Sequence, residues 1–308
     1  AAGAPPAAPP PPGFVNAAST DFTRPGAAAP LQEALTALQN ASPAEWPLRI
    51  NGRAVAGGGG WQGSVNPAQP EQVLGHWAVA TVAQVEPAVI AARAAQPRWE
   101  AAPISVRTAI LRRLADRMEA RRAPLTALEI LEAGKPWAEA DADVSEAIDF
   151  CRYYALEMER RAAPRLTQKV PGERNESSFL ARGVGVVIAP WNFPLAILCG
   201  MTTAPLVAGN TVILKPAEQT SLLGAEFFAL LEEAGLPPGV AHLLTGPGET
   251  VGAALVEHPE VDFIAFTGSR PVGTSIYETA GRTSASSRGL KKVICEMGGK
   301  NALILDET

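Results

Sequence analysis

The 308-residue sequence is poor in the residues that build disulfide frameworks and metal centres, with three cysteines and three histidines. Cys151, Cys199 and Cys295 lie far apart in the chain, each among apolar residues. An odd and scattered set of cysteines favours structural thiols in a reducing compartment, so we expect a cytoplasmic protein. The histidines share no ligand spacing with one another or with a cysteine, and we therefore predict no metal site.

The sequence also lacks an excess of positive charge. Its formal net charge is -5, which gives no reason to expect a nucleic acid as partner. The densest basic run, at 107–122, alternates arginines with apolar residues at helical spacing. A helix with one solvated basic face explains this pattern better than a phosphate-binding stripe does.

No apolar run in the sequence is suited to span a membrane. The long charge-free stretch at 183–214 is interrupted by Pro190, Pro194 and Pro205. It divides into a β-branched strand, a helix of small residues and a second buried strand. This succession is typical of the βαβ unit of a parallel sheet, so we expect no membrane partner.

Strands and helices alternate regularly in the second half of the chain. The predicted strands are 184–188, 211–214, 241–245, 261–266 and 291–295, and the helices between them are 196–208, 218–234, 250–257 and 270–280. Short connections between such units predict an α/β fold with a five-stranded, parallel, doubly wound, Rossmann-like sheet. Helices are expected on both faces of this sheet.

The first half of the chain predicts smaller units. Residues 1–13 are rich in proline and alanine, lack the features of a signal peptide and predict a tail that is either disordered or extended as polyproline II. Strands are expected at 47–55 and 73–80, a short helix at 31–38, and a helical layer at 82–94, 103–121, 125–133 and 137–161. Residues 166–170 and 177–181 flank a turn and predict a β-hairpin. Because a hairpin is not stable alone in water, we expect it to pair with another sheet, either of this chain or of a neighbouring subunit.

These units suggest a division of the chain into five parts. They are a tail and arm (1–45), strands with a helical layer (46–163), a hairpin flap for oligomerisation (164–183), an α/β core (184–296) and the start of a further domain (297–308).

Ligands of doubly wound sheets bind beyond the carboxyl ends of the strands, so the residues that follow each strand are candidates for a site. The loop after the first strand contains Asn192 but no GxGxxG pattern, and the ordinary dinucleotide fingerprint is therefore absent. Lys215 and Glu218 follow the second strand. A carboxylate there can accept ribose hydroxyl protons, which favours NAD over its 2'-phosphorylated form. A surface ion pair is the alternative explanation for these two residues.

Two further segments follow the fourth and fifth strands. Thr267, Gly268 and Ser269 lead into a helix whose free N–H groups and dipole suit a pyrophosphate, although an ordinary capped helix has the same pattern. Glu296 stands close to two glycines after the last strand. A carboxylate in this setting is either a general base or a turn residue.

Taken together, these segments resemble the NAD(P)-dependent aldehyde dehydrogenase superfamily in order and spacing. The motifs are APWNFP at 189–194, KPAEQT at 215–220, FTGS at 266–269 and EMGGK at 296–300. The resemblance extends from about residue 47 to residue 308. Within the superfamily, the sequences at 14–22, 146–155, 171–177 and 189–201 look most like the 1-pyrroline-5-carboxylate dehydrogenase branch.

The resemblance implies a role for each matching position. Asn192 would donate its amide to an oxyanion, Glu296 would activate a water molecule, and Phe193 would border the aldehyde channel. The implied contacts to NAD are Ile188, Ala189, Pro190, Trp191, Lys215, Ala217, Glu218, Gly248, Thr267, Gly268, Ser269 and Gly298.

The implied reaction is the oxidation of L-glutamate 5-semialdehyde to L-glutamate in proline catabolism, by thiohemiacetal formation, hydride transfer and thioester hydrolysis. The alternatives are another aldehyde such as succinate semialdehyde, or a family member that binds NAD without catalysis. The resemblance also implies a homodimer or a higher homo-oligomer.

The nucleophilic cysteine of the family lies a few dozen residues beyond the EMGGK motif. We therefore expect this chain to be the N-terminal part of a longer polypeptide and to lack that cysteine and the rest of the catalytic domain. Cys295 adjoins Glu296 but falls inside a predicted strand, where alternation points neighbouring side chains to opposite faces.

Overall fold

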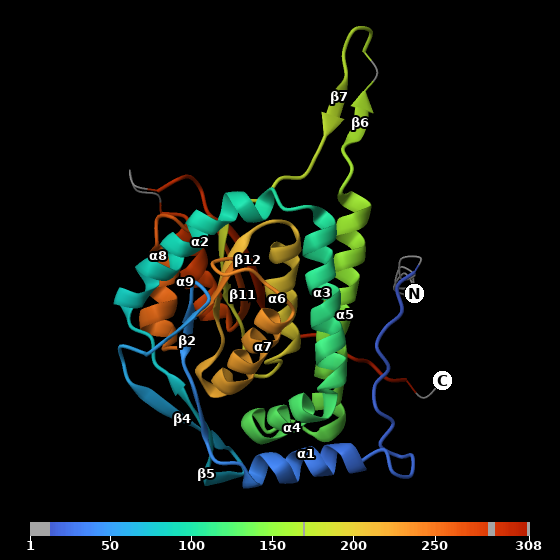
Figure 1. Cartoon of the computed structure of the whole chain (residues 1–308), viewed down its shortest axis with the longest axis vertical. Coiled ribbons are helices and arrows are strands. Elements are labelled where there is room, and N and C mark those ends of the chain that lie inside the picture. The colour runs from blue at the N-terminus through green and yellow to red at the C-terminus, as the bar shows by residue number, and fades with distance from the viewer. Residues whose placement is uncertain (1–12, 169, 283–286, 307–308) are drawn as a thin grey trace.

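A seven-stranded mixed sheet lies at the centre of the computed structural model, which describes residues 13–168, 170–282 and 287–306 (Figure 1). The order of its strands is β12-β11-β8-β9-β10-β2-β3. Their bounds are β2 (Leu48–Ile50), β3 (Arg53–Val55), β8 (Val184–Ile188), β9 (Thr211–Lys215), β10 (Ala241–Leu243), β11 (Phe263–Gly268) and β12 (Lys292–Met297). The tail predicted at 1–13 lies outside the described residues apart from Gly13.

The predicted sheet was too small by two strands. The strands from β12 to β10 are parallel, as predicted, but β2 pairs antiparallel with β10 and β3 pairs antiparallel with β2. The stretch 47–55 is therefore not one strand but a hairpin. Asn51 and Gly52 form its turn with φ of 54° and 71°, and two positive φ values match the twist of a two-residue hairpin.

A second sheet of three strands has the order β1-β5-β4. It consists of β1 (Ala44–Trp46), β4 (Trp61–Asn66) and β5 (Gln69–Ala78). The strand predicted at 73–80 corresponds to most of β5, whereas β4 was not predicted.

Helices cover both faces of the seven-stranded sheet, as predicted. Val186 and Val187 are neighbours on β8, and because side chains alternate along a strand they belong to two different cores. The core of Val186 includes α2 (Val85–Glu100), α8 (Ala253–Glu257) and α9 (Arg270–Ala280). The core of Val187 includes α3 (Ile104–Ala120), α4 (Arg122–Ala133), α5 (Trp137–Arg161), α6 (Ala196–Val207) and α7 (Ser221–Glu233), and α1 (Ala29–Asn40) packs below α4 (Figure 1). In the part of the chain that the structure describes, no helix is both long and apolar enough to cross a membrane.

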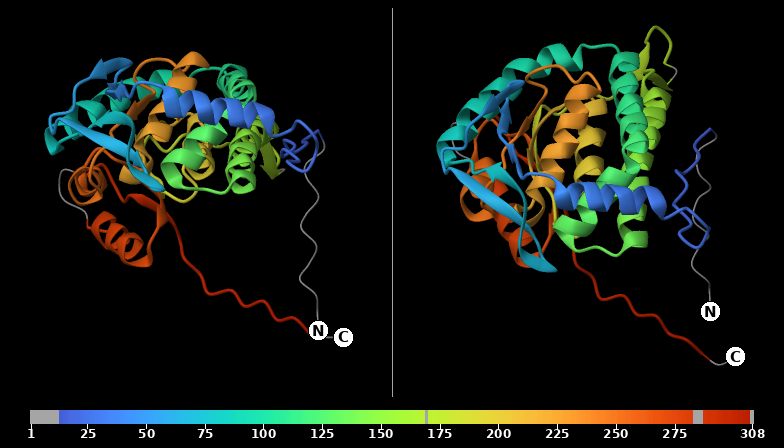
Figure 2. Two further views of the ribbon diagram at one scale, coloured as in Figure 1. Left: turned by 90° about the horizontal axis from the view of Figure 1, so that it is seen from below. Right: turned by 60° about the horizontal axis from the view of Figure 1, so that its bottom comes forward.

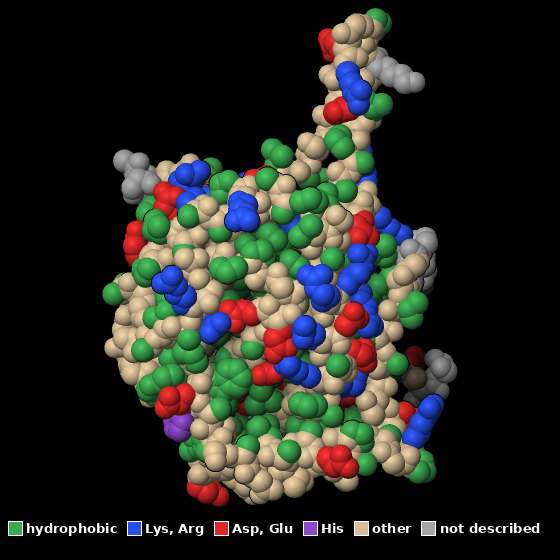
Figure 3. Space-filling view, in the orientation of Figure 1, with side chains coloured by type: hydrophobic (Ala, Val, Ile, Leu, Met, Phe, Trp, Pro, Cys, Tyr) green, Lys and Arg blue, Asp and Glu red, His purple; other side chains and the backbone are tan. Residues whose placement is uncertain are grey.

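The arginines of the basic run lie on the outer side of α3 and at its end. Arg107 is buried, which was not predicted, whereas the other arginines of the run are partly or fully exposed, as predicted, and each of three pairs with an acid of a neighbouring helix. Arg112 lies 2.7 Å from Glu159 of α5, while Arg117 and Arg121 lie 2.9 and 2.8 Å from Glu233 of α7. Figure 3 shows the resulting mixture of basic and acidic side chains on this face. The face is thus solvated and charge-balanced, which does not suit a phosphate-binding stripe.

The predicted hairpin is present but shorter than expected. Its strands β6 (Arg165–Gln168) and β7 (Asn175–Ser177) form a separate two-stranded sheet. This sheet projects from the body of the molecule above α3 and α5, and every residue of β6 is exposed (Figure 1).

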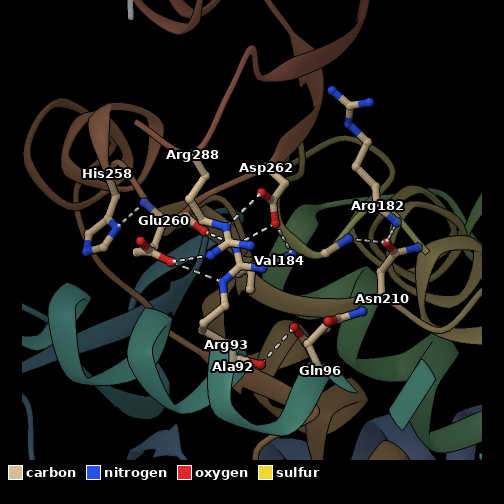
Figure 4. A network of polar contacts seen from close by, with 12 residues as sticks. Ala92, Arg93, Gln96, Arg182, Val184, Asn210, His258, Glu260, Asp262 and Arg288 are labelled. Carbon is tan, nitrogen blue, oxygen red and sulfur yellow. Dashed lines mark hydrogen bonds and ion pairs between the residues drawn. The ribbon is translucent and has the colours of Figure 1, made fainter. Parts of the chain in front are cut away.

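Side chains tie the central strands together at their amino ends (Figure 4). Asp262, just before β11, accepts the N–H of Val184 at 2.7 Å and pairs with Arg93 of α2. Asn210, just before β9, accepts the N–H of Gly183 at 2.9 Å. The start of β8 is therefore held by residues that precede both of its neighbouring strands, and the carboxyl ends of the strands remain available for a site.

Candidate active site

The register of the parallel strands brings the predicted site segments to one edge of the sheet. Ile188, the last residue of β8, pairs with Lys215 on β9 and with Phe266 on β11. Thr267 then pairs with Glu296 on β12. Neighbouring strands are about 5 Å apart, so β8 and β12 are separated by about 10 Å at this edge. The segments that carry Asn192 and Glu296 thus both leave the sheet at its carboxyl edge.

Lys215 and Glu218 form an ion pair at this edge with a largely buried cation. The Lys215 side chain is 4% exposed, which excludes an ordinary surface pair, and its Nζ donates to Glu218 Oε1 at 2.8 Å. Burial by itself tends to raise the pKa of Glu218. The charge and hydrogen bond of Lys215, together with the N–H groups of Glu218 and Gly248, outweigh burial and lower this pKa below its ordinary value. The structure therefore brings Lys215, Glu218 and Gly248 together around an ionised carboxylate.

A cavity of about 490 Å³ between α8 and α9 adjoins this ion pair. Two of the predicted cofactor residues, Ile188 and Gly248, line it, together with Gly252, Val272 and other residues of the two helices. The backbone N–H of Gly248 also donates to the carboxylate of Glu218. Gly248 therefore belongs both to the cavity lining and to the surroundings of the ion pair. Ala217 precedes the short helical turn that carries Glu218. Ala189 and Pro190 continue from β8, and the N–H of Ala189 donates to the Lys215 carbonyl at 3.3 Å.

The segment from Thr267 to Ser269 ends β11 and begins α9. Ser269 has the extended backbone of an N-cap residue, with φ of -70° and ψ of 147°. The alternative of an ordinary capped helix lacks its side-chain cap here, because the Ser269 hydroxyl makes no capping hydrogen bond. Pro271 occupies the second helical position and has no N–H, which removes one of the donors that an N-cap side chain uses.

A second cavity, of about 540 Å³, lies between α6 and strands β11 and β12. Glu296 lines it together with Met201 of α6 and Thr267 of β11. The neighbouring Cys295 points the other way, with its Sγ 3.7 Å from the Gly273 carbonyl of α9. The prediction that Cys295 and Glu296 face opposite sides of the strand is therefore confirmed.

The loop between β8 and α6 presents three exposed side chains. Trp191 is 54% exposed and Phe193 is 44% exposed. Asn192 is also exposed, and its side-chain amide has no hydrogen-bond partner among the described residues. Helix α6, which follows this loop directly, supplies Ile197 and Met201 to the cavity that Glu296 lines. The Asn192 loop and Glu296 thus flank the same helix.

Gly298 is a predicted cofactor residue that the structure does not bring to the others. It lies just beyond β12, where the chain runs away from the body (Figure 2). A Cβ atom added at Gly298 would meet nothing within 4 Å.

The cysteines are less scattered in space than in sequence. Cys151 of α5 and Cys199 of α6 are both buried and free, and their Sγ atoms lie 3.5 Å apart. Burial raises the pKa of Cys151 well above its ordinary value, and burial also raises the pKa of Cys295. These positions and environments do not suit a nucleophile at the carboxyl edge. Among the described residues, no three His, Cys, Asp or Glu side chains form a group that could hold a metal ion.

The sequence did not point to a buried ionic cluster behind the Asn192 loop. Lys135 donates to the Asn192 carbonyl at 3.0 Å and lies 3.8 Å from Glu129 and 3.6 Å from Asp143. Burial, followed by the charge of Asp143, raises the pKa of Glu129 well above its ordinary value. A lysine between a glycine and a proline at a helix end resembles a solvated turn residue, so the local sequence gave no signal of this cluster.

This chain is similar in sequence and in structure to known proteins. Residues 58–308 match the model of the aldehyde dehydrogenase family. The chain is 45% identical over 263 residues to 1-pyrroline-5-carboxylate dehydrogenase 2 of Bacillus subtilis, which covers 85% of this chain and 51% of that protein. The chain therefore spans about half the length of this relative.

Solved structures show the same similarity. A 1-pyrroline-5-carboxylate dehydrogenase from Thermus, solved with bound NAD, has a TM-score of 0.90 and 44% identity, covering 93% of this chain and 56% of that one. Proline utilization A from Bdellovibrio bacteriovorus has a TM-score of 0.91 and 42% identity, covering 96% of this chain and 31% of that one.

Proposed function

The chain belongs to the aldehyde dehydrogenase family, and we propose on this basis that it takes part in the oxidation of L-glutamate 5-semialdehyde to L-glutamate with NAD. The names of the relatives from Bacillus subtilis and Thermus support this choice of substrate. The observation that carries the proposal is the common position of Asn192, the Lys215–Glu218 pair and Glu296 at the carboxyl edge of the sheet. This reaction belongs to proline catabolism.

The residues at this edge fit NAD. Glu218 is held ionised by Lys215 and Gly248, and an ionised carboxylate is the acceptor that ribose hydroxyl groups require. Gly268, Ser269 and the N-terminus of α9 offer N–H groups to the pyrophosphate. Ile188 and Gly248 would form the wall of the cofactor cleft, with Trp191 and Thr267 at its border. NAD, when bound, would supply the hydride acceptor for the aldehyde.

Asn192 and Glu296 would act in the attack on the aldehyde and in the hydrolysis of the thioester. The free amide of Asn192 would donate to the oxyanion that forms when a thiolate attacks the aldehyde. Glu296 is exposed beside a cavity, where it would take a proton from the water that hydrolyses the thioester. Phe193 would border the aldehyde path. The thiolate is not one of Cys151, Cys199 and Cys295, because these thiols are directed elsewhere.

An assay of NADH formation by the full-length gene product tests the proposal. We expect turnover with glutamate 5-semialdehyde to exceed turnover with succinate semialdehyde. Faster turnover with succinate semialdehyde would move the assignment to another branch of the family. Binding of NAD without turnover of any aldehyde would instead favour a non-catalytic family member.

Replacing Glu218 with glutamine should weaken the preference for NAD over NADP by about tenfold or more, because a hydrogen bond to a charged acceptor is lost. The ratio of kcat/KM for the two cofactors measures this effect. Glu233→Gln, on the helix that follows, is the matched control and should leave the ratio unchanged. An unaltered ratio in Glu218→Gln would contradict a role of this carboxylate at the ribose.

We also propose that the protein is a cytoplasmic homodimer or higher homo-oligomer. The exposed β6–β7 hairpin pairs with no other strand in the described part of the chain, so a second copy can pair with its backbone edges. Two free thiols 3.5 Å apart are compatible with a reducing compartment.

A further inference from the structure

Lys135 is buried directly behind the Asn192 loop. Helix α4 ends at Gly134, whose φ of 68° turns the chain inward, and Pro136 then caps α5. The Lys135 side chain is 7% exposed. Its Nζ donates to the Asn192 carbonyl at 3.0 Å and lies 4.3 Å from the centre of the Phe193 ring. One cation therefore contacts two consecutive residues of the loop that carries the proposed oxyanion donor.

Asp143 of α5 holds the other end of the same segment. Its Oδ2 accepts the N–H groups of Leu195 and Ala196, each at 3.2 Å, at the start of α6. Lys135 lies 3.6 Å from the Oδ1 of Asp143, so the two side chains form a clamp on residues 192–196. Because the clamp grips the main chain, it restricts the position of the Asn192 side chain without contacting that side chain.

The buried charged groups around this clamp lower the stability of the fold. Glu129 and Asp143 are both buried, and neither oxygen of Glu129 has a hydrogen-bond partner in the described part of the chain. Buried ion pairs are often no more stabilising than apolar residues of similar volume. A cluster that keeps unsatisfied carboxylate oxygens beside a candidate catalytic loop therefore points to a role in placing that loop.

We propose that Lys135 is a positioning residue that, together with Asp143, fixes the Asn192 amide at the site of the oxyanion. The proposal rests on the proposed function, because it assumes that Asn192 stabilises charge during the attack on the aldehyde. Lys135 touches neither substrate nor cofactor in this scheme and acts only through the main chain of the loop.

The test is a double-mutant cycle in the full-length gene product. Lys135→Met should lower kcat about a hundredfold, the loss that a displacement of about 1 Å causes in an active site, and should leave the Kd of NAD unchanged. In the background of Asn192→Ala, Lys135→Met should cost almost nothing further. A merely structural role would give the same loss in both backgrounds, and this result would overturn the proposal.

A second variant distinguishes the loss of positioning from a failure to fold. Lys135→Met leaves Asp143 without its cation, whereas Lys135→Met combined with Asp143→Asn removes both charges and keeps an oxygen to accept the N–H groups of α6. The combined variant should show the same loss of kcat and the same dependence on Asn192.

Crystal structures of these variants give a readout that needs no turnover. The main chain of Asn192 and Phe193 should move by about 1 Å while α4 and α5 stay in place. An unmoved loop would overturn the proposal whatever the activity. If the loop moves but Asn192→Ala has normal kcat, the positioning role stands and the proposed role of Asn192 in the reaction falls.

Discussion

Replacing Glu296 with glutamine is expected to lower steady-state kcat by about two to four powers of ten, the usual contribution of a general base. Glutamine keeps the shape of the side chain beside the cavity that Met201 and Thr267 line, but it cannot take a proton from water. Hydride transfer precedes the hydrolysis in the proposed sequence of steps. Rapid mixing of the full-length gene product with NAD and aldehyde should therefore still show a burst of about one NADH for each site, followed by slow turnover.

Cys295→Ser provides the matched control for this experiment. Cys295 precedes Glu296 on β12, but its Sγ faces the Gly273 carbonyl of α9 on the other side of the strand. Its substitution should leave both the burst and the steady state close to those of the unmodified protein. Normal steady-state turnover in Glu296→Gln would show that another group activates the water.

Replacing Asn192 with alanine is expected to lower kcat about a hundredfold to a thousandfold, the loss measured when one oxyanion donor is removed. The exposed amide has no partner among the described residues, so its removal breaks no hydrogen bond within them. The Kd of NAD, measured by titration calorimetry, should change little. The NADH burst should slow together with the steady state, because the affected step comes before hydride transfer.

The rate of the NADH burst distinguishes the effects of the two substitutions. Asn192→Ala should slow the burst, whereas Glu296→Gln should spare it. Asn40→Ala at the exposed end of α1 is a control for the change from asparagine to alanine and should have no effect. A normal burst in Asn192→Ala would contradict the assignment of the oxyanion donor to this residue.

The parallel part of the fold was predictable because its signals are local. Each central strand is a short β-branched or apolar run between turn residues, and the helices α5 and α9 have the bounds 137–161 and 270–280 that the sequence predicted. The stretch 47–55 was predicted as strand, but its division into β2 and β3 was missed although Asn51-Gly52 is a strong hairpin signal. Even a correctly recognised hairpin would not reveal its partner, since pairing with β10 joins residues nearly two hundred positions apart.

The candidate site was predictable to the extent that it follows the ends of strands. Ile188, Lys215, Thr267 and Glu296 lie along one edge of the sheet because its parallel strands end there. Lys135 was missed because its contact with Asn192 joins residues 57 positions apart and depends on how α4 and α5 pack. The approach of Cys151 to Cys199 depends in the same way on the packing of α5 against α6.

The side-chain contacts at the amino ends of β8, β9 and β11 have a consequence for how such a protein can diverge. Asp262 and Asn210 hold the start of β8 at the rim opposite the candidate site. Loops at the opposite rim can therefore change in length and chemistry while the strands keep their alignment. Sequence change can alter one rim of the sheet without disturbing the contacts that hold the strands at the other.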